Sequence, residues 1–126
     1  MTHLEATFSV DGFDPRPDEI PAVDGAPETG RAVLHKTYAG GLVGTAVAEF
    51  MSTGQTAYLA QERIEGTLEG RPGSFVLQHG AATDPPAQWA FVVGGSGTGG
   101  LTGLRGSGTV EHGLLVLDWE LDAPPA

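Results

Sequence analysis

Glycine and proline interrupt every apolar stretch of this chain, and this punctuation constrains its fold more than any other feature. The 126 residues include 20 glycines and 9 prolines, and no long segment keeps a helical period. The best helical candidate, residues 45–51, is too short to be told apart from a strand. The chain is therefore expected to be all-β.

Short runs with a two-residue period recur along the chain. Leu4, Ala6, Phe8 and Val10 alternate with polar residues, as in a strand with one buried face. Further strands are predicted at residues 31–38, 42–51, 56–64, 74–79, 88–93, 101–110 and 114–121, and residues 66–70 either extend one of these or begin another. Brief Gly-rich turns join most of them, which is typical of a barrel or a sandwich.

A recurring Leu-x-Gly motif favours the barrel. It occurs as Leu42-Val43-Gly44, Leu68-Glu69-Gly70 and Leu101-Thr102-Gly103. Glycine inside a strand marks a bend, a bulge or a close approach of backbones, and a small barrel needs such bends to close. We expect one domain over residues 1–126, a single antiparallel β-barrel of about eight strands.

Two connections are expected to be irregular. Residues 11–29 hold four prolines and six acidic residues against one base, Arg16, so this Pro-rich acidic segment is predicted to contain no regular strand or helix. Residues 80–87, with Pro85 and Pro86, form the second predicted loop. A long irregular loop such as residues 11–29 is either a lid over the barrel mouth or a mobile surface loop.

The charge balance argues against two classes of partner. Sixteen acidic and 6 basic residues give a net charge of −10, which repels nucleic acid and anionic membrane surfaces. No cysteine is present, which excludes disulfides and thiol chemistry. Neither a signal-peptide pattern nor an apolar stretch of about 20 residues is visible, so the expected location is the cytoplasm.

No motif for a metal, a nucleotide or a nucleophile is complete. The Gly-rich segment 96–103 lacks the lysine of a phosphate-binding loop and leads into a sequence that no helix would tolerate. His3, His35, His79 and His112 show no metal-binding spacing. Ser74 lacks the surroundings of a nucleophile elbow. We expect no metal site and no cofactor.

Polar residues fall on faces that alternation could turn inward. Lys36 and Tyr38 share a face with Leu34, and Tyr58 shares one with Glu62. On the next run, Gln78 falls with Ser74 and Val76, whereas His79 falls with Phe75 and Leu77. If these faces point inward, the cost of burying charges implies a Lys36–Glu62 pair or a functional pocket. If they point outward, the same side chains are simply solvated, and periodicity leaves both possibilities open.

Several of these residues also belong to motifs that resemble a known family. They are Lys36-x-Tyr38 with Gly40-x-Leu42-x-Gly44-Thr45, Tyr58, a long stretch from Glu62-Arg63-Ile64 to Gln78-His79, and Ser96-Gly97-Thr98-Gly99-x-Leu101-x-Gly103. In order and over residues 31–106, they resemble the bacterial DUF3224 family, small proteins of unassigned function. The chain departs from the family pattern at Gly41, Gly100 and near Trp119, and each departure makes a site more apolar.

The resemblance implies an allene-oxide-cyclase-like barrel, an architecture shared with dirigent proteins and with barrel cyclases of polyketide pathways. Those relatives bind an apolar, reactive molecule inside the barrel and steer its ring closure. This is an analogy of fold, which does not by itself imply function.

The leading hypothesis is therefore a barrel that binds a small, largely apolar molecule in its interior, a site able to support a cofactor-independent isomerase or cyclase. His79 is the candidate for proton transfer because an imidazole titrates near neutrality. The other expected catalytic residues are Lys36, Tyr58 and Glu62, and the expected ligand-binding residues are Tyr38, Gln78, Phe75, Ser96 and Trp89.

The alternative is a barrel filled by side chains, with a non-catalytic structural or oligomeric accessory role, a homodimer included. A cavity of about 300 Å³ or more would distinguish an open barrel from a filled one.

Overall fold

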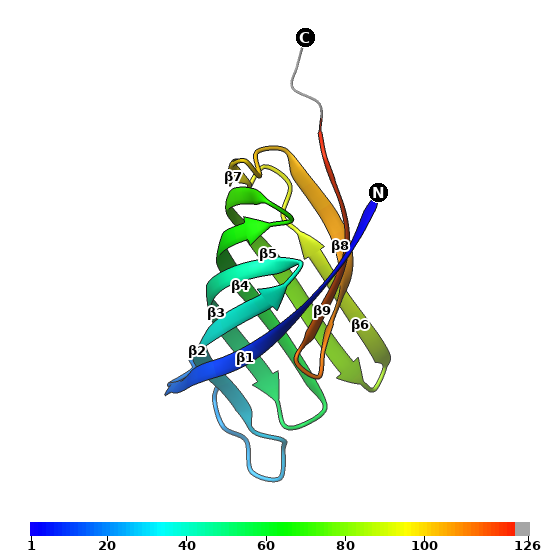
Figure 1. The fold of residues 1–126 in the computed structure, drawn as a ribbon. Helices are drawn as coiled ribbons and strands as arrows, with labels where there is room; N and C mark the ends of the chain where they lie inside the picture. Colours follow the sequence, from blue (N-terminus) through cyan, green and yellow to red (C-terminus); the bar gives the residue numbers. More distant parts are fainter. Residues whose placement is uncertain (123–126) are drawn as a thin grey trace.

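A computed structural model describes residues 1–122 of the chain, and these residues form strands and no helix (Figure 1). The strands are β1 (Thr2–Arg16), β2 (Thr29–Gly40), β3 (Leu42–Thr53), β4 (Ala57–Leu68), β5 (Arg71–Thr83), β6 (Pro86–Val92), β7 (Thr98–Gly99), β8 (Leu104–Glu111) and β9 (Leu114–Leu121). Among them there is therefore no helix that could cross a bilayer.

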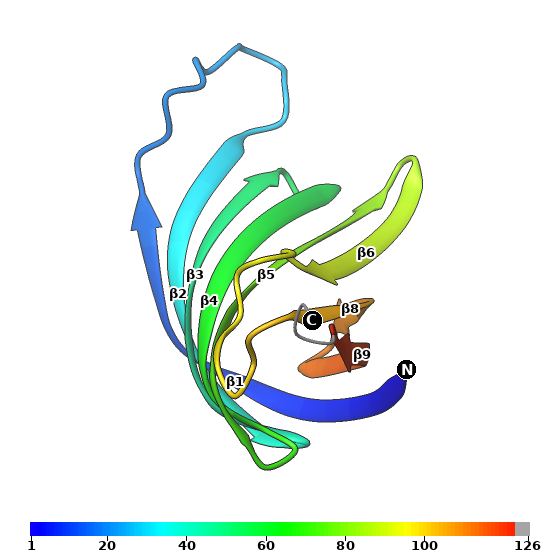
Figure 2. The ribbon, with the colours of Figure 1, turned by 90° about the horizontal axis from the view of Figure 1, so that it is seen from above.

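Eight of the strands close into one antiparallel barrel. Each strand from β1 to β5 pairs with the next, β6 pairs with β8, and β8 pairs with β9. The pairing of β9 with β1 completes the ring, which is seen from above in Figure 2, and β7 adds to the edge of β5. The predicted all-β fold, an antiparallel barrel of about eight strands, is confirmed.

One half of the barrel interior is filled by apolar side chains. Alternation along each strand sends every second residue inward, and the inward residues near β7 are almost fully buried. They include Leu42, Ile64, Leu68, Phe75, Leu77, Leu101, Leu104, Leu115 and Leu117. Toward the opposite end, several alanines and polar residues occupy inward positions beside Phe8, Leu34 and Phe50, and there the interior is not filled.

Glycines allow the strands to approach closely in the filled half. Gly44 of β3 pairs with Gly66 of β4, and Gly66 pairs with Gly73 of β5. A Cβ atom on Gly44 would overlap the carbonyl oxygen of Glu65 and lie 2.8 Å from Cα of Gly66. The Leu-x-Gly prediction is thus right for Gly44, but Gly70 and Gly103 lie in turns with φ of 85° and 83°.

Two of the predicted connections are wrong in their bounds. β1 continues through Pro15 to Arg16 and pairs with β2, so the irregular segment spans only residues 17–28. β9 pairs with β1 only as far as Thr7, so this second half of β1 has one free edge. A proline has no N–H group to donate, and at a free edge no neighbouring strand requires one.

The predicted loop at residues 80–87 is also absent. β5 continues to Thr83 and β6 begins at Pro86, so two residues, Asp84 and Pro85, make the turn. Small side chains at positions 80–82 gave no strand-like alternation, although their backbone pairs regularly with β6. The strand predicted at 101–110 begins only at Leu104.

Candidate functional site

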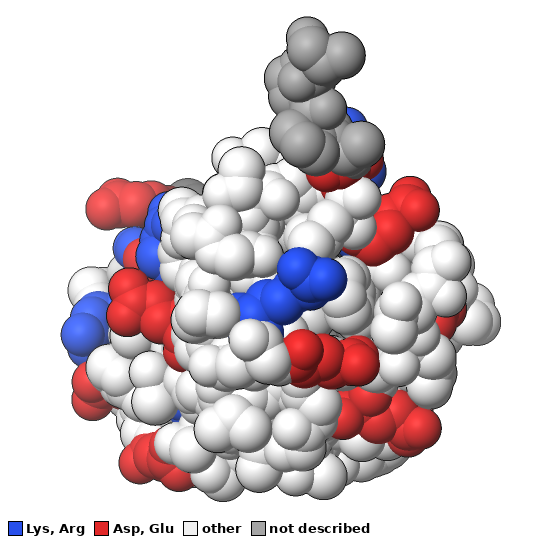
Figure 3. Space-filling view, turned by 45° about the horizontal axis from the view of Figure 1, so that its top comes forward, with Lys and Arg blue, Asp and Glu red and all other residues white. Residues whose placement is uncertain are grey.

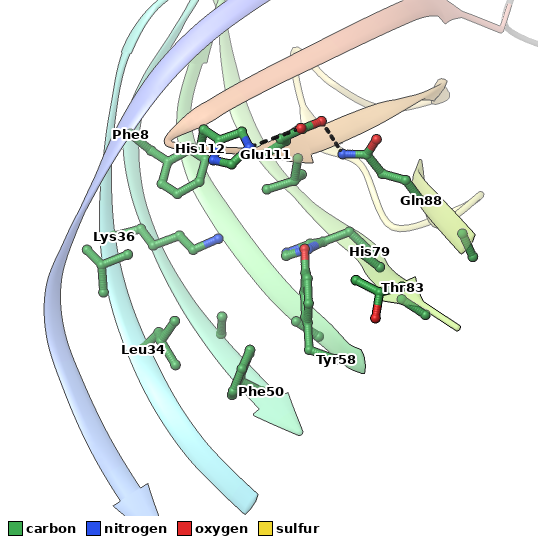
Figure 4. A pocket seen from close by; sticks show the side chains of 17 residues that line it. Phe8, Leu34, Lys36, Phe50, Tyr58, His79, Thr83, Gln88, Glu111 and His112 are labelled. Atoms are coloured by element: carbon green, nitrogen blue, oxygen red, sulfur yellow. Dashed lines mark hydrogen bonds and ion pairs between the residues drawn. The ribbon is translucent and has the colours of Figure 1, made fainter. Parts of the chain in front are cut away.

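The unfilled half of the barrel contains a cavity of about 540 Å³ that opens to solvent. Its wall is largely apolar, with the rings of Phe8 and Phe50 and the methyl groups of Ala48, Ala60 and Ala81. Lys36, Tyr58 and His79 bring polar groups to it from β2, β4 and β5 (Figure 4). A small number of polar groups in an apolar pocket of this size is typical of small-molecule sites.

Three ionisable side chains meet beneath this cavity. Lys36, Glu62 and His79 are 4%, 0% and 3% exposed. Nζ of Lys36 lies 2.7 Å from Oε2 of Glu62, and Nε2 of His79 lies 2.8 Å from the same oxygen. The Lys36–Glu62 pair predicted from alternation is therefore present, and His79 joins it.

Register explains how side chains from three strands reach one another. On β3, Ala46 faces Lys36 and Ala48 faces Glu62 across their ladders. Because these alanines are small, the Lys36 side chain can extend across β3 to Glu62 on β4. His79 pairs with Ala60, which places it diagonally from Glu62, within reach of a long side chain.

Two tyrosines complete the network. The hydroxyl of Tyr38 donates a hydrogen bond to Oε1 of Glu62. The hydroxyl of Tyr58 lies 3.0 Å from Nδ1 of His79, and the two rings meet edge to face. Glu62 thus accepts hydrogen bonds from three side chains, and no buried side-chain polar atom among the described residues lacks a partner.

The partners of Glu62 keep it ionised. Burial opposes its ionisation, but the hydrogen bond from His79, the charge of Lys36 and the hydrogen bonds from Lys36 and Tyr38 together hold the pKa of the carboxyl group below its usual value. Burial, followed by the charge of Glu62, raises the pKa of both Tyr38 and Tyr58. Both tyrosines are therefore phenols at neutral pH and can donate protons.

These charge states define a proton path that ends at the cavity. When Nε2 of a neutral His79 donates to the carboxylate, Nδ1 is an acceptor, so the Tyr58 hydroxyl donates to it. If the Tyr58 oxygen accepts a proton from a molecule in the cavity, Tyr58 can pass its own hydroxyl proton to Nδ1 of His79. The Glu62 carboxylate then stabilises the resulting imidazolium. Lys36 adds a positive charge at the cavity wall, 4.5 Å from the centroid of the Phe8 ring.

None of the five predicted ligand-binding residues lines the cavity. Gln78 points outward and binds Gln61 on the outer face, because Leu77 and His79 take the inward positions of β5. Trp89 stacks on Phe91, also outside. Phe75 belongs to the filled half.

The fourth, Ser96, stabilises a turn. Its hydroxyl accepts a hydrogen bond from the backbone N–H of Val76 and donates one to the carbonyl of Val93. Tyr38 belongs to the network through Glu62 but does not reach the cavity wall.

Sequence reasoning missed a polar group at the cavity mouth. Gln88 of β6 donates a hydrogen bond of 2.6 Å to Glu111 of β8, and Nε2 of His112 lies 3.1 Å from the other oxygen of Glu111 (Figure 4). Glu111 and His112 lie at a turn between two predicted strands, and only barrel closure brings Gln88 beside them. Among the described residues no group of three or more histidines or carboxylates is placed to hold a metal ion.

Most of the surface visible in Figure 3 is neutral, and acidic side chains are more widespread there than basic ones. On this face, acidic side chains are spread over the surface, whereas basic ones lie along the left edge and near the centre. The expectation that nucleic acid is not a partner stays a prediction of the sequence.

Comparisons with known proteins add a family and a solved structure. The family model described as "Protein of unknown function (DUF3224)" matches residues 4–113. A crystal structure of a DUF3224 protein of unknown function from Shewanella oneidensis MR-1 is similar, with a TM-score of 0.85 and 32% identity over 98% of this chain and 99% of that chain. No curated protein matches.

Proposed function

Because the chain belongs to the DUF3224 family, whose function is unknown, we propose a function from the geometry of the site: it binds a small, largely apolar molecule that carries an oxygen group, and it moves a proton on that molecule without a cofactor. The observation that carries this proposal is the buried chain from Glu62 through His79 to Tyr58, which ends at the wall of an open, apolar cavity.

The groups that face the cavity favour an oxygen on the ligand. Glu62 already accepts hydrogen bonds from three donors, so the polar atoms that this network offers to a ligand are the ammonium of Lys36 and the hydroxyl of Tyr58. Lys36 donates hydrogen bonds to a ligand, and Tyr58 donates one once His79 is protonated and no longer accepts its proton; a carbonyl or alkoxide oxygen accepts both. The apolar wall, with Phe8, Phe50 and several alanines, suits the remainder of the molecule.

This arrangement suits isomerisation or cyclisation through an enolate. Lys36 and Tyr58 would stabilise negative charge that develops on a carbonyl oxygen, a contribution of several kcal/mol in low-dielectric sites. His79 would hold the proton in transit, which contributes about 10²–10⁴-fold in rate when the donor is well placed. A bound conformer held for reaction lowers the barrier further.

Native mass spectrometry of freshly purified protein tests the binding step. We expect a small apolar molecule to be released on denaturation, or thermal stabilisation by members of a panel of apolar ketones and enones. Absence of both would overturn the proposal and favour a non-catalytic accessory role. The cytoplasmic location and the homodimer stay predictions of the sequence.

Substitution of Tyr58 tests the proton step once a ligand is identified. Tyr58→Phe keeps the ring and removes the hydroxyl, so binding should change little while proton exchange on the ligand, followed by deuterium incorporation, falls about 10²-fold or more. Gln78→Ala, on the outer face, is the control and should leave both unchanged. Equal exchange rates in all three proteins would remove Tyr58 from the mechanism.

A further inference from the structure

Lys36 is the only lysine in this sequence, since the other five basic residues are arginines. It is also 4% exposed and lies inside the barrel, where its ammonium group reaches the cavity wall. A lysine amine can act as a nucleophile toward a carbonyl carbon, whereas an arginine guanidinium cannot. The one side-chain amine of the protein is therefore confined to the one place where a bound carbonyl compound would meet it.

We propose that Lys36 forms a Schiff base with an aldehyde or ketone that enters the cavity. This inference rests on the proposed function and narrows its ligand class to carbonyl compounds. In Figure 4 the Lys36 amine points toward Tyr58 and His79. Oε2 of Glu62 lies between Nζ of Lys36 and Nε2 of His79, so a bound carbonyl would approach Nζ from the cavity side of this carboxylate, near the proton donors.

The groups that contact Lys36 can stabilise the protonated Schiff base as well as the unmodified side chain. Its Nζ lies 2.7 Å from Oε2 of Glu62. A protonated Schiff base keeps one N–H group and one positive charge, so it retains the same carboxylate as its hydrogen-bond partner and counterion. The ring of Phe8, 4.5 Å from Nζ, also attracts a cation in either state. The buried pair is therefore preserved, and no unpaired charge is created.

The reaction balances without an oxidant or a reductant. The nitrogen lone pair of Lys36, exposed when the ammonium loses a proton to the network, attacks the carbonyl carbon and forms the C–N bond. The π electrons move to oxygen, which is protonated by Tyr58. The nitrogen then loses a second proton, which passes through the network to the hydroxyl group, and the C–O bond breaks as the regenerated nitrogen lone pair forms C=N. The oxygen leaves as water with two of the three ammonium protons, and His79 and Tyr58 return to their starting states.

Reductive trapping of the full-length protein tests the proposal. The protein is incubated with each of a panel of aryl and alkyl aldehydes, 2-naphthaldehyde among them, and with sodium cyanoborohydride, which converts the Schiff base into a stable secondary amine. Peptide mapping by mass spectrometry then locates the adduct. We expect Lys36 to be labelled about tenfold or more faster than the exposed N-terminal amine, because binding orients the reactants.

Two variants provide matched controls. Lys36→Arg keeps the charge beside Glu62 and should lose the adduct at position 36, while labelling of the N-terminus continues. Gln61→Lys in the Lys36→Arg background places the only lysine on the outer face of β4, where Gln61 is exposed, and this lysine should react no faster than the N-terminus. If Lys36→Arg does not fold, the ratio of the labelling rates of Lys36 and the N-terminal amine in the unmodified protein tests the proposal by itself.

The outcomes separate this inference from the proposed function. Thermal stabilisation is measured in parallel with 2-naphthalenemethanol, the alcohol analogue that cannot form a Schiff base. Stabilisation by the alcohol together with slow labelling of Lys36 across the whole aldehyde panel would overturn the inference and leave the proposed function standing. No stabilisation and no selective labelling would overturn both.

Discussion

At the scale of single residues, Glu62 controls the site. It is fully buried, accepts hydrogen bonds from Lys36, His79 and Tyr38, and supplies the negative charge that offsets the buried ammonium. A buried charge that loses its partner is far more costly than an exposed one. The stability of the barrel and the chemistry of the cavity therefore depend on the same carboxylate.

Glu62→Gln should lower the free energy of unfolding by about 3 kcal/mol, because it keeps the shape of the side chain but leaves Lys36 without a counterion. Urea denaturation measures this loss. Glu65→Gln, an exposed position on the same strand, should change stability by no more than about 0.5 kcal/mol. Equal effects of the two substitutions would contradict this role of Glu62.

The stabilising effect of Glu62 should disappear in acid. Because the pKa of Glu62 in the folded protein lies below its usual value, the carboxylate stabilises the fold above the unfolded pKa of about 4.3, and this contribution is lost as the pH falls toward the folded pKa. The difference in unfolding free energy between the unmodified protein and Glu62→Gln should shrink below about pH 4. A difference that stays constant between neutral pH and about pH 3 would refute this linkage.

At the scale of elements, the glycines at the paired positions of β3, β4 and β5 decide how closely these strands approach. Gly44→Ala should destabilise the protein by about 3 kcal/mol, because its Cβ would overlap backbone atoms of Glu65 and Gly66, which cannot move away as a flexible side chain could. Thermal unfolding measures the effect. Gly94→Ala is the control, since the nearest atom to its Cβ is 4.0 Å away, and a similar loss there would show that close approach is not the cause.

At the scale of the whole molecule, the barrel closes weakly on one side. β6 and β8 share two register pairs, Ala90 with Gly108 and Phe91 with Ser107, whereas β3 and β4 pair along their full lengths. At the mouth of the cavity, a hydrogen bond between the side chains of Gln88 and Glu111 also links the two strands.

Backbone amides of β6 should therefore exchange with solvent hydrogen before those of β4, because fewer backbone hydrogen bonds resist local opening. Hydrogen exchange read by mass spectrometry on peptides from the two strands measures this order. Protection of β6 that equals that of β4 would show that the ring is uniformly stable.

Much of the site could be predicted from local patterns, with one ambiguity. Alternation placed Lys36 with Tyr38 and Tyr58 with Glu62 on common faces, and the pair Lys36–Glu62 followed if those faces were inward. On β5, alternation alone could not choose between Gln78 and His79. Trp89 lies on the outer face of β6, because Ala90 and Val92 take the inward positions of that strand.

The sequence by itself determined the class of fold, most strand positions and the family, since a two-residue period, Gly-rich turns and ordered motifs are local properties of the chain. Tertiary structure alone decided which face is inside, that His79 and Tyr58 join the Lys36–Glu62 pair, and that half of the interior is hollow. These features depend on register and on ring closure between strands distant in sequence. A shift of one residue in pairing would turn every side chain to the opposite face.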